Sequence, residues 1–483
     1  MKISVQKNGE PIYQKLAGCL EEMIHTRSLR PGDRLPSVRQ FSRQQRVSVP
    51  TALQALATLE TRGLIEARPK SGFYVRARLA QLVPQPGNGG QPAAKVIDLA
   101  GPDPAASLLT NQGNSVLAPL GAALPSPELL PGGKLALIVG RVSRELGPES
   151  VCYDLPPGSE VLRRELSRRS LEWGCSLKPQ EFIVTNGCTE AISLALRATC
   201  VPGNTVAVES PTYFGLVCVL RELGLKALPI PTDSVRGADL DAFERMLRRT
   251  KVAACVLIPN FNNPTGALMP DENKERLVKL LSAREIPILE DDLYGDLQHR
   301  GNRPCCLKAF DRDGSVVLCS SFSKTLAPGY RVGFVAAGRW HERVLRLKAS
   351  SSLACPTVTT LAVAEFLKSG GYDRHLRGLR EHFRQQVARM GEAVAGFFPE
   401  GIGLSRPQGG FVLWCELPAR VDSIKLFKEA HGAGVSVAPG PLFSPQGGCR
   451  NFIRLNCGYP WSARMERSVE LLGQLLKRQL GAK

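Results

Sequence analysis

A lysine in a serine-rich turn, Lys324, has neighbours that a covalent, anion-binding site would need. It follows the apolar run SVVLCSS, Ser321 and Ser323 lie beside it, and Arg331 comes seven residues later. A lone lysine in such a turn is usually a surface residue with a solvated amine. Here the hydroxyls and the guanidinium can bind a phosphate while the amine reaches an aldehyde carbon. The spacing therefore predicts a Schiff-base lysine beside a phosphate.

Three other segments can complete the same site. The turn NNPTG at 262–266 is a weak signal, because Asn-Pro turns are common. In ILEDDLY at 288–294, Asp291 stands at the end of a strand, where a carboxylate can keep a pyridine nitrogen protonated. A solvated strand end is the alternative for these acids. The segment TNGCT at 185–189 opens a helix, whose N–H groups and positive end can take a phosphate.

The scaffold for these segments is predicted by apolar runs that alternate with helical patterns after about residue 95. The runs are FIVTNG, TVAVESP, ACVLIPN, IPILEDD and SVVLCSS. Short β-rich runs separated by helical stretches favour a parallel sheet with helices on both faces. We therefore expect an α/β body.

The composition indicates a globular chain of several domains. Its 483 residues suggest two to four domains, and its 43% hydrophobic and 22% charged residues are typical of globular proteins. No apolar run is long enough to span a bilayer, and the first residues lack the apolar core of a signal peptide. We expect no membrane association and a cytoplasmic location. Fourteen cysteines at irregular spacings predict reduced thiols and no metal site.

Positive charge is concentrated at the start of the chain. The net charge is +18, and residues 1–80 hold 14 basic and 6 acidic side chains. Such an excess permits an anionic partner, for example nucleic acid. Residues 79–95 are rich in Pro, Gly, Gln and Ala and predict a flexible linker. The predicted domains are a head of 1–78, a linker of 79–95 and a body of 96–483.

The head has the pattern of a winged helix-turn-helix. Helical spacing predicts a helix over 11–24, Ser37 is the expected cap of a second helix, and Ser48 that of a third. LIEARPKSGFYVR then alternates like a two-stranded wing. The third helix would enter the major groove by its N-terminal end, Ser48 to Gln54. A small helical cap with a solvated basic face is the alternative. The residues expected to neutralise phosphates are Arg34, Arg39, Arg68 and Lys70.

The segment from PIYQKLAGCLEEMI to RPKSGFYV resembles the GntR-family winged helix along its whole length. The resemblance implies DNA contacts at Arg39, at the start of the recognition helix and at the wing tip. Many GntR heads carry arginine where this chain has Val49 and Leu53, so base contacts are expected from Ser48, Thr51, Gln54 or the wing. The operator sequence stays open. The predicted DNA-binding residues are Arg34, Ser37, Arg39, Ser48, Thr51, Gln54, Lys70 and Gly72.

The four segments of the body, in this order, resemble the fold-type-I pyridoxal-phosphate aminotransferases over roughly residues 96–480. The resemblance implies a large subdomain of about 140–345 and a smaller α+β subdomain of about 346–483. It implies that Lys324 forms the internal aldimine with pyridoxal 5'-phosphate and that Asp291 pairs the pyridine nitrogen. Asn263 and Tyr294 would contact the ring hydroxyl, and Tyr213 would stack on the ring.

The same resemblance implies the phosphate and substrate contacts. Arg454 would clamp an amino-acid carboxylate. Tyr153 would reach the phosphate of the partner subunit, which implies a homodimer. Thr189 stands where the family often has glutamine. The expected phosphate contacts are Asn186, Gly187, Cys188, Ser321, Ser323 and Arg331.

The combination of both halves resembles the MocR subgroup of bacterial transcription regulators, which are typically domain-swapped dimers. It implies a regulator that binds double-stranded operator DNA and senses an amino compound by aldimine exchange at Lys324. The alternative is a metabolic aminotransferase for an α-amino acid such as 2-aminoadipate, with a modulatory head. A racemase, decarboxylase or lyase on the same fold is a third reading. An intact site does not distinguish a sensor from an enzyme, and the effector and the direction of regulation stay open.

Overall fold

The computed structural model describes residues 11–25, 28–29, 33–68, 71–75, 83–87, 95–99 and 117–481. The chain divides into two compact units, Met1–Pro84 and Gln85–Lys483, and the division falls inside the expected linker of 79–95. Positions 79–82 and 88–94 of that linker lie outside the described residues. Within the described ranges, no helix is long and apolar enough to cross a membrane.

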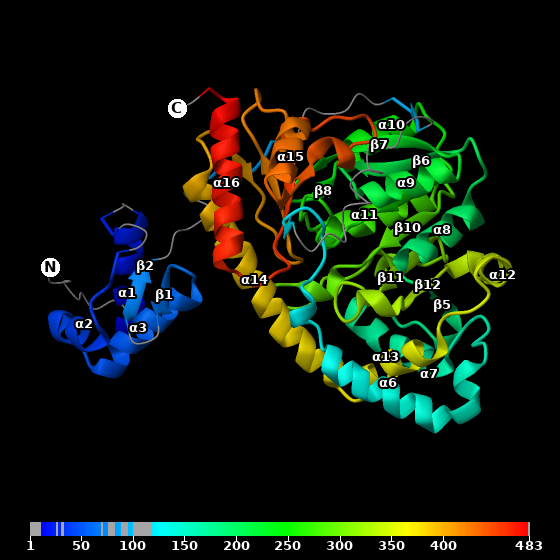
Figure 1. Cartoon of the computed structure of the whole chain (residues 1–483), viewed down its shortest axis with the longest axis horizontal. Helices are drawn as coiled ribbons and strands as arrows, with labels where there is room; N and C mark the ends of the chain where they lie inside the picture. The colour runs from blue at the N-terminus through cyan, green and yellow to red at the C-terminus, as the bar shows by residue number, and fades with distance from the viewer. Residues whose placement is uncertain are drawn as a thin grey trace. The chain divides into compact units, whose positions relative to one another are not determined.

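Over its described residues, the first unit has three helices and a two-stranded wing (Figure 1). Leu16, Leu20, Leu56 and Leu59 meet in its core, because their spacing puts them on the inner faces of two helices. The wing strands pair antiparallel, with Ile65 opposite Val75. The elements are α1 (Ile12–His25), α2 (Val38–Gln45), α3 (Val49–Thr61), β1 (Ile65–Arg68) and β2 (Gly72–Val75). The predicted winged helix-turn-helix is confirmed.

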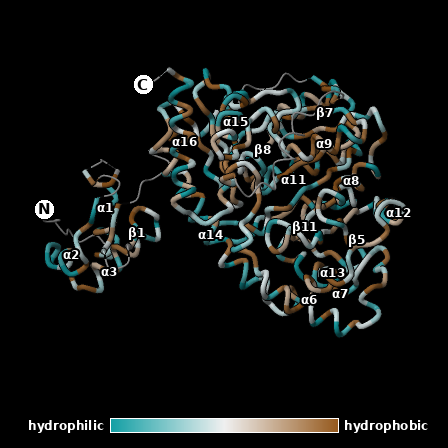
Figure 2. Tube along the Cα trace, viewed as in Figure 1, coloured by the Kyte–Doolittle hydropathy of each residue, from teal (hydrophilic) through white to brown (hydrophobic). Residues whose placement is uncertain are grey.

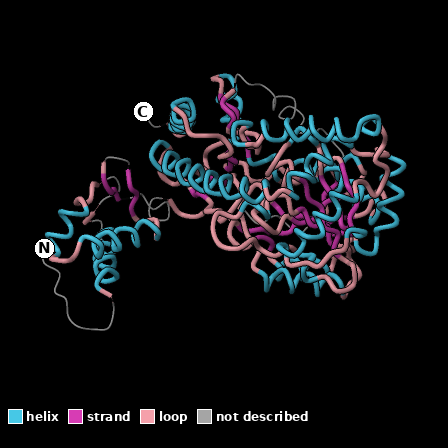
Figure 3. Tube along the Cα trace, turned by 90° about the horizontal axis from the view of Figure 1, so that it is seen from below, coloured by secondary structure: helices cyan, strands magenta, loops and turns pink. Residues whose placement is uncertain are grey.

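The second unit is built on a nine-stranded sheet, which Figure 3 shows with helices around it. The order is β3-β7-β6-β9-β10-β11-β12-β5, and β8 pairs with β7. Strands β7, β6, β9, β10 and β11 are mutually parallel, while β12 runs antiparallel between β11 and β5. The strands are β3 (Ile97–Asp98), β5 (Phe182–Thr185), β6 (Thr205–Ser210), β7 (Lys226–Asp233), β8 (Gly237–Ala238), β9 (Ala254–Leu257), β10 (Ile288–Asp291), β11 (Val316–Ser321) and β12 (Gly333–Ala336).

Both faces of this sheet are buried, which explains why its strands are apolar at nearly every position. Val256 and Leu289 pack on one face against helices α8, α9 and α12. Cys255 and Ile288, one residue away in each strand, pack on the other face against α10 and α11. The helices are α8 (Cys188–Thr199), α9 (Phe214–Glu222), α10 (Leu240–Leu247), α11 (Asp271–Ser282) and α12 (His341–Ser351). Hydrophobic and hydrophilic stretches alternate along them, as expected for helices with one buried face (Figure 2).

The C-terminal part holds an antiparallel sheet of order β13-β14-β17-β16. Beside it, β4 and β15 form a separate two-stranded parallel sheet, which ties residues near 118 to residues near 435. The remaining elements are β4 (Ala118–Pro119), α6 (Gly132–Leu146), α7 (Glu160–Ser170), α13 (Thr357–Lys368), α14 (Gly371–Phe397), β13 (Gly403–Leu404), β14 (Val412–Glu416), α15 (Ser423–Gly432), β15 (Val435–Ser436), β16 (Ala438–Pro439), β17 (Phe452–Asn456) and α16 (Ala463–Gln479).

Candidate functional site

The predicted site residues follow the carboxyl ends of parallel strands. Asp291 ends β10, Ser321 ends β11, and the turn with Asn263 follows β9. Gly187 follows β5, which runs parallel to β11 because both pair antiparallel with β12. Ligands of open α/β sheets bind outside the carboxyl ends of the strands, so this edge is where a site is expected.

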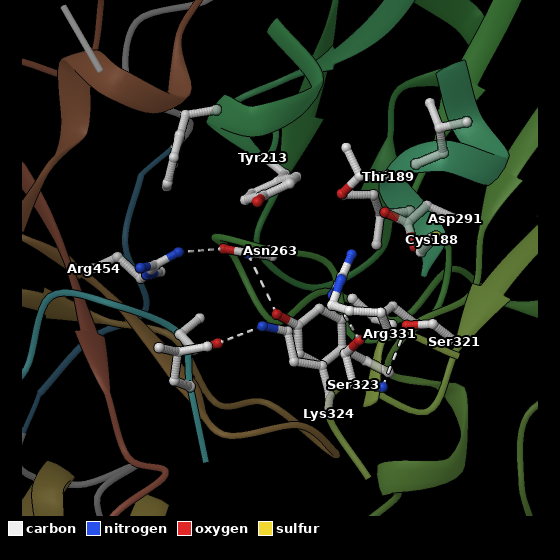
Figure 4. A pocket seen from close by; sticks show the side chains of 17 residues that line it. Cys188, Thr189, Tyr213, Asn263, Asp291, Ser321, Ser323, Lys324, Arg331 and Arg454 are labelled. Atoms are coloured by element: carbon white, nitrogen blue, oxygen red, sulfur yellow. Dashed lines mark hydrogen bonds between the residues drawn. The ribbon is translucent and has the colours of Figure 1, made fainter. Parts of the chain in front are cut away.

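A pocket lies at this edge, and its volume is about 180 Å³. A single water needs roughly 10–15 Å³ on this measure, so the pocket admits a molecule with a ring. Figure 4 shows Arg454 on one side of it, Asp291 with Cys188 on the other, and Lys324 between them. The lining residues are Ala123, Leu124, Cys188, Thr189, Ile192, Tyr213, Phe214, Ile258, Asn263, Asp291, Leu293, Tyr294, Ser321, Ser323, Lys324, Arg331 and Arg454.

The amine of Lys324 projects into this pocket from the turn after β11. Its Nζ donates a hydrogen bond to the carbonyl oxygen of Ala123 at 2.8 Å. Burial, reinforced by the positive charge of Arg454, lowers the pKa of Lys324 to about 8. At neutral pH an amine with this pKa has a far larger neutral fraction than an ordinary lysine has, as a nucleophilic lysine requires.

A buried carboxylate, Asp291, stands opposite Arg454. Burial raises the pKa of Asp291 to about 6, and the neighbouring charge of Asp292 acts in the same direction. The thiol of Cys188 donates a hydrogen bond to Oδ1 of Asp291 at 3.4 Å. This carboxylate can accept a hydrogen bond from a protonated ring nitrogen, whose positive charge would compensate the buried negative one.

The start of α8 forms an anion-binding cradle. Gly187 precedes the helix with φ of +86°, and within the described part of the chain no side chain caps the first turn. Arg331 closes the cradle, because its Nη2 donates to the carbonyl of Asn186 at 2.9 Å. A Cβ at Gly187 would lie only 2.5 Å from that nitrogen, so glycine is required here. The open N–H groups, Ser321, Ser323 and Arg331 together suit a phosphate.

A guanidinium that is 1% exposed, that of Arg454, lies at the far end of the pocket. Its Nη1 donates to Oδ1 of Asn263 at 2.9 Å, and it stacks 4.9 Å from the ring centroid of Phe443. Nη2 donates to the carbonyl of Gly121, whereas the buried Nε has no hydrogen-bond partner among the described residues. Burial lowers the pKa of Arg454 to about 10. A buried cation with an unused donor suits a carboxylate ligand.

The side chains predicted around a cofactor ring also meet here. Nδ2 of Asn263 donates to the hydroxyl of Tyr294 at 3.4 Å. Tyr213 lies on the side of the pocket opposite Lys324 in Figure 4, and burial raises its pKa to about 12. Both tyrosines therefore remain neutral hydrogen-bonding groups at physiological pH.

Three predicted cofactor contacts do not line the pocket, and one of them is Gly187, although the next residue, Cys188, does. The amide side chain of Asn186 is directed to Glu190 Oε1 and to the carbonyl of Ala354, so only its backbone oxygen meets Arg331. Tyr153 is 77% exposed and lines no part of this pocket. Its predicted contact would lie in a partner subunit.

Other groups that contribute to the site were not predicted from the sequence. The carbonyls of Gly121 and Ala123 accept from Arg454 and Lys324, but backbone acceptors carry no sequence signature. Glu209, at the end of β6, accepts from Asn262 Nδ2 at 2.8 Å and from the N–H of Ile258 at 2.7 Å. It thereby holds the turn that carries Asn263, and burial raises the pKa of Glu209 to about 8. The signal that could have identified Glu209 is its place as an acid within the apolar run TVAVESP.

In the head, the described DNA-contact candidates lie at the start of α2, in the first half of α3 and at the wing. Ser48 caps α3 by accepting from the N–H of Thr51 at 3.2 Å, and Ser37 caps α2 by accepting from that of Gln40 at 3.3 Å. Arg34, Arg39 and Gln54 are exposed. Gly72 begins β2 beside the guanidinium of Arg34, while Lys70 lies outside the described residues.

The pocket fits pyridoxal 5'-phosphate by its donor set. The cradle at Gly187 would hold the phosphate, Asp291 the ring nitrogen, and Asn263 with Tyr294 the ring hydroxyl. The amine of Lys324 is placed for the aldehyde carbon. Every charged end of the cofactor thus has a complementary group in one pocket.

Comparison with known proteins identifies a family for each of the two units. Residues 153–470 match the aminotransferase class I and II family, and residues 12–75 match the bacterial regulatory proteins of the gntR family. The uncharacterized HTH-type transcriptional regulator YjiR of Escherichia coli is 38% identical over 97% of this chain and 99% of its own length. The 2-aminoadipate transaminase of Thermus thermophilus is 32% identical over 73% of this chain and 88% of its own.

Among solved structures, LysN, an alpha-aminoadipate aminotransferase from T. thermophilus complexed with N-(5'-phosphopyridoxyl)-L-leucine, superposes with a TM-score of 0.74 at 29% identity, covering 79% of this chain and 97% of that one. Fold and site thus define a pyridoxal-phosphate-dependent, aminotransferase-like body that shares its chain with a winged helix-turn-helix. The chain belongs to the MocR subgroup of GntR-family regulators, whose body is of the aminotransferase class I and II family.

The lowered pKa of Lys324 gives a testable pH dependence. Only the unprotonated amine attacks an aldehyde, so the rate at which added pyridoxal 5'-phosphate attaches should rise with pH and reach half its maximum near pH 8. An ordinary lysine would give a midpoint near pH 10.4. Stopped-flow absorbance on cofactor-free protein measures this rate, and a midpoint above pH 10 would show that the pocket leaves the amine unperturbed.

Proposed function

We propose that this protein is a pyridoxal-phosphate-dependent transcription regulator whose body senses a small amino compound. The observation that carries the proposal is the full-length similarity to YjiR, which spans the winged head and the body together. A basic head with a recognition helix exposed at its start and a body with a pocket lined by most of the predicted cofactor contacts are both present in one chain. Such a pairing suits a protein that converts ligand binding into a change at DNA.

In the body, each residue has a defined task. Bound pyridoxal 5'-phosphate supplies an aldehyde carbon that bonds reversibly to a primary amine. Lys324 contributes the amine that an effector would displace, and its lowered pKa makes the neutral form accessible. Arg454 binds the carboxylate of an effector that has one, while Asp291 keeps a proton on the ring nitrogen. The described pocket therefore selects a primary amine that carries an anionic group.

Coupling to DNA requires that the effector bind two states of the protein differently. Arg454 connects strands and segments that are far apart in sequence, since it reaches Asn263 and Gly121 at once. A carboxylate at Arg454 would compete for the guanidinium and shift these contacts. We infer that the change in the contacts of Arg454 with Asn263 and Gly121, when a carboxylate binds, is the structural event that distinguishes the liganded state.

We further propose that the body works as a homodimer. Large hydrophobic side chains are exposed around 137–155, which is unusual for a surface that faces only water. Leu137 is 77% exposed, Val151 89%, Tyr153 77% and Leu155 57%. A second copy over this surface would bury them and bring Tyr153 toward the partner's phosphate, as the family resemblance implies. The domain-swapped arrangement stays a prediction.

The test is DNA binding by the cofactor-loaded full chain, with a panel of amino acids and amines. Duplexes enriched from a random library should be bound with a strong salt dependence. At constant salt, one amino compound should change the affinity by at least about fivefold, the lower range of known couplings. The same compound should change the visible absorption of the bound cofactor. If compounds that alter the absorption leave DNA affinity unchanged, the sensing proposal is wrong.

The metabolic aminotransferase is the second candidate, because the 2-aminoadipate transaminase of T. thermophilus is 32% identical and Lys324, Asp291 and Arg454 all line the pocket. Steady turnover of an amino acid with a 2-oxo acid, at a rate unaffected by operator DNA, would favour this reading. A single, stable spectral change without turnover would favour the sensor.

A further inference from the structure

An apolar face at the start of α3 is exposed, and the function of the body does not use it. Val49 is 47% exposed and Leu53 49% exposed. They are four residues apart, so they lie on one face of the helix. Ala52, Leu56 and Leu59, on the adjoining face of α3, are buried in the head core. About half of the Val49 and Leu53 side chains therefore remains accessible for a contact outside that core.

We propose that Val49 and Leu53 read thymine methyl groups in the major groove, so that the operator presents A·T pairs to the N-terminal half of α3. The inference rests on the proposed function and adds the chemistry of base recognition to it. Thymine is the base that carries a methyl group on its major-groove edge, and apolar side chains recognise it. N-terminal residues of a recognition helix are those that reach base edges.

The charge around this face identifies DNA as its occupant. Arg39 and Arg43 are exposed on α2, and Arg46 is exposed just before α3. Arg34 lies beside Gly72 at the start of the wing strand β2. Exposed arginines on α2, just before α3 and beside the wing suit a duplex, whose phosphates run along both edges of the groove. An apolar face intended for another protein would not need this border of arginines.

The composition of α3 selects A·T rather than G·C. Its sequence, VPTALQALATLET, has neither lysine nor arginine, the side chains that read guanine. Gln54 is exposed next to Leu53 and is the type of side chain that pairs with adenine. Glu60, the residue that could accept from cytosine, accepts instead from the N–H of Ala67 at 3.0 Å. Ser48 and Thr51 are engaged with each other, with 2.7 Å between their hydroxyl oxygens.

The experiment removes methyl groups one at a time from the DNA. The cofactor-loaded full chain selects duplexes from a random library, and each thymine of the enriched sequence is then replaced by deoxyuridine. This change deletes only the methyl group. At positions read by Val49 or Leu53, affinity should fall about fourfold, the effect of one buried methyl. Other positions should change less than twofold.

One variant and a matched control assign the contact to the side chain of Leu53. Leu53→Ala should bind the thymine and deoxyuridine duplexes equally at one position and keep the discrimination elsewhere. Ile12→Ala is the matched control, because Ile12 is also 47% exposed but lies on α1. It should keep the full discrimination at every position. Thermal unfolding of all proteins should be alike, since the replaced side chains are exposed.

The outcomes separate the inference from the function on which it rests. Enriched duplexes that tolerate deoxyuridine at every position, or that present only G·C pairs to α3, overturn the inference while DNA binding stands. Unchanged discrimination by Leu53→Ala, or a changed sedimentation coefficient of this variant with unchanged DNA affinity, would show that the face contacts something other than thymine. A library without any enriched duplex would overturn the proposed function and this inference with it.

Discussion

Replacing Lys324 with alanine is expected to abolish covalent attachment of pyridoxal 5'-phosphate and the response to effector. Lys324 supplies the primary amine that lines the pocket. The lowered pKa of this amine increases its neutral, reactive fraction near neutral pH. After borohydride reduction, intact-protein mass spectrometry should show one phosphopyridoxyl group on the native chain and none on the variant. DNA affinity of the variant should no longer depend on the amino compound.

The fold should survive this change. Burial penalises the protonated form of Lys324, so its removal does not take away a stabilising ion pair. Lys324→Met, which keeps most of the volume, provides a second variant if alanine leaves too large a cavity. Lys425→Ala on α15, with a side chain that is 64% exposed, is the control that should retain the cofactor mass. An effector response that persists in both Lys324 variants would contradict the proposed mechanism.

Replacing Asp291 with asparagine should weaken cofactor binding, whereas the same change at Asp292 should weaken the fold. Asp291 is directed to the pocket, where its charge can pair with a protonated ring nitrogen. A hydrogen bond between charged groups contributes roughly 1.5–3 kcal/mol, so affinity should fall about 10- to 100-fold. Calorimetric titration with pyridoxamine 5'-phosphate measures this loss, because that compound cannot bond covalently to Lys324.

The neighbouring acid is the matched control. Asp292 is 3% exposed, accepts from Asn260 Nδ2 at 2.9 Å and forms an ion pair with Arg303. Asp292→Asn leaves the buried Arg303 with Asp296 as its ion-pair partner, so the loss in the free energy of unfolding should be a part of the roughly 3–5 kcal/mol that breaking a buried pair outright costs. Urea unfolding of the cofactor-free proteins should show this loss for Asp292→Asn and a much smaller one for Asp291→Asn. A larger loss of stability for Asp291→Asn than for Asp292→Asn would contradict the assignment of Asp291 to the cofactor and of Asp292 to the fold.

Local signals were sufficient to predict much of the fold. The apolar runs predicted as strands are β5, β6, β9, β10 and β11, because residues buried on both faces of a sheet must be apolar throughout. Strand β12 was not predicted, and it reverses direction between β11 and β5. Short strands of this kind are placed by pairing with neighbours, which local propensity does not encode.

The site shows the same division between local and long-range information. Lys324, Asp291, Asn263, Ser321 and Arg331 could be selected from the sequence, because turn chemistry and strand ends are local features. Asn186 was predicted as a phosphate contact, but its side-chain amide donates instead to Glu190, which lies four residues later in the chain, in α8. The acceptors Gly121 and Ala123 were not predicted, since any residue type offers the same carbonyl.

The sequence alone was sufficient to predict a basic winged head and, through its family resemblance, a pyridoxal-phosphate body, because residue types at fixed spacings carry that information. The family resemblance selected Asp291 from the run Glu290-Asp291-Asp292, but the residue types alone did not show why this acid faces the ligand. Side chains alternate along a strand, so Glu290 and Asp292 lie on one side, where they bind backbone N–H groups and Arg303. Asp291 lies on the other side, beside Cys188 and the pocket. Only the packing of β10 between β9 and β11, with α8 on one face, decided which side became the site.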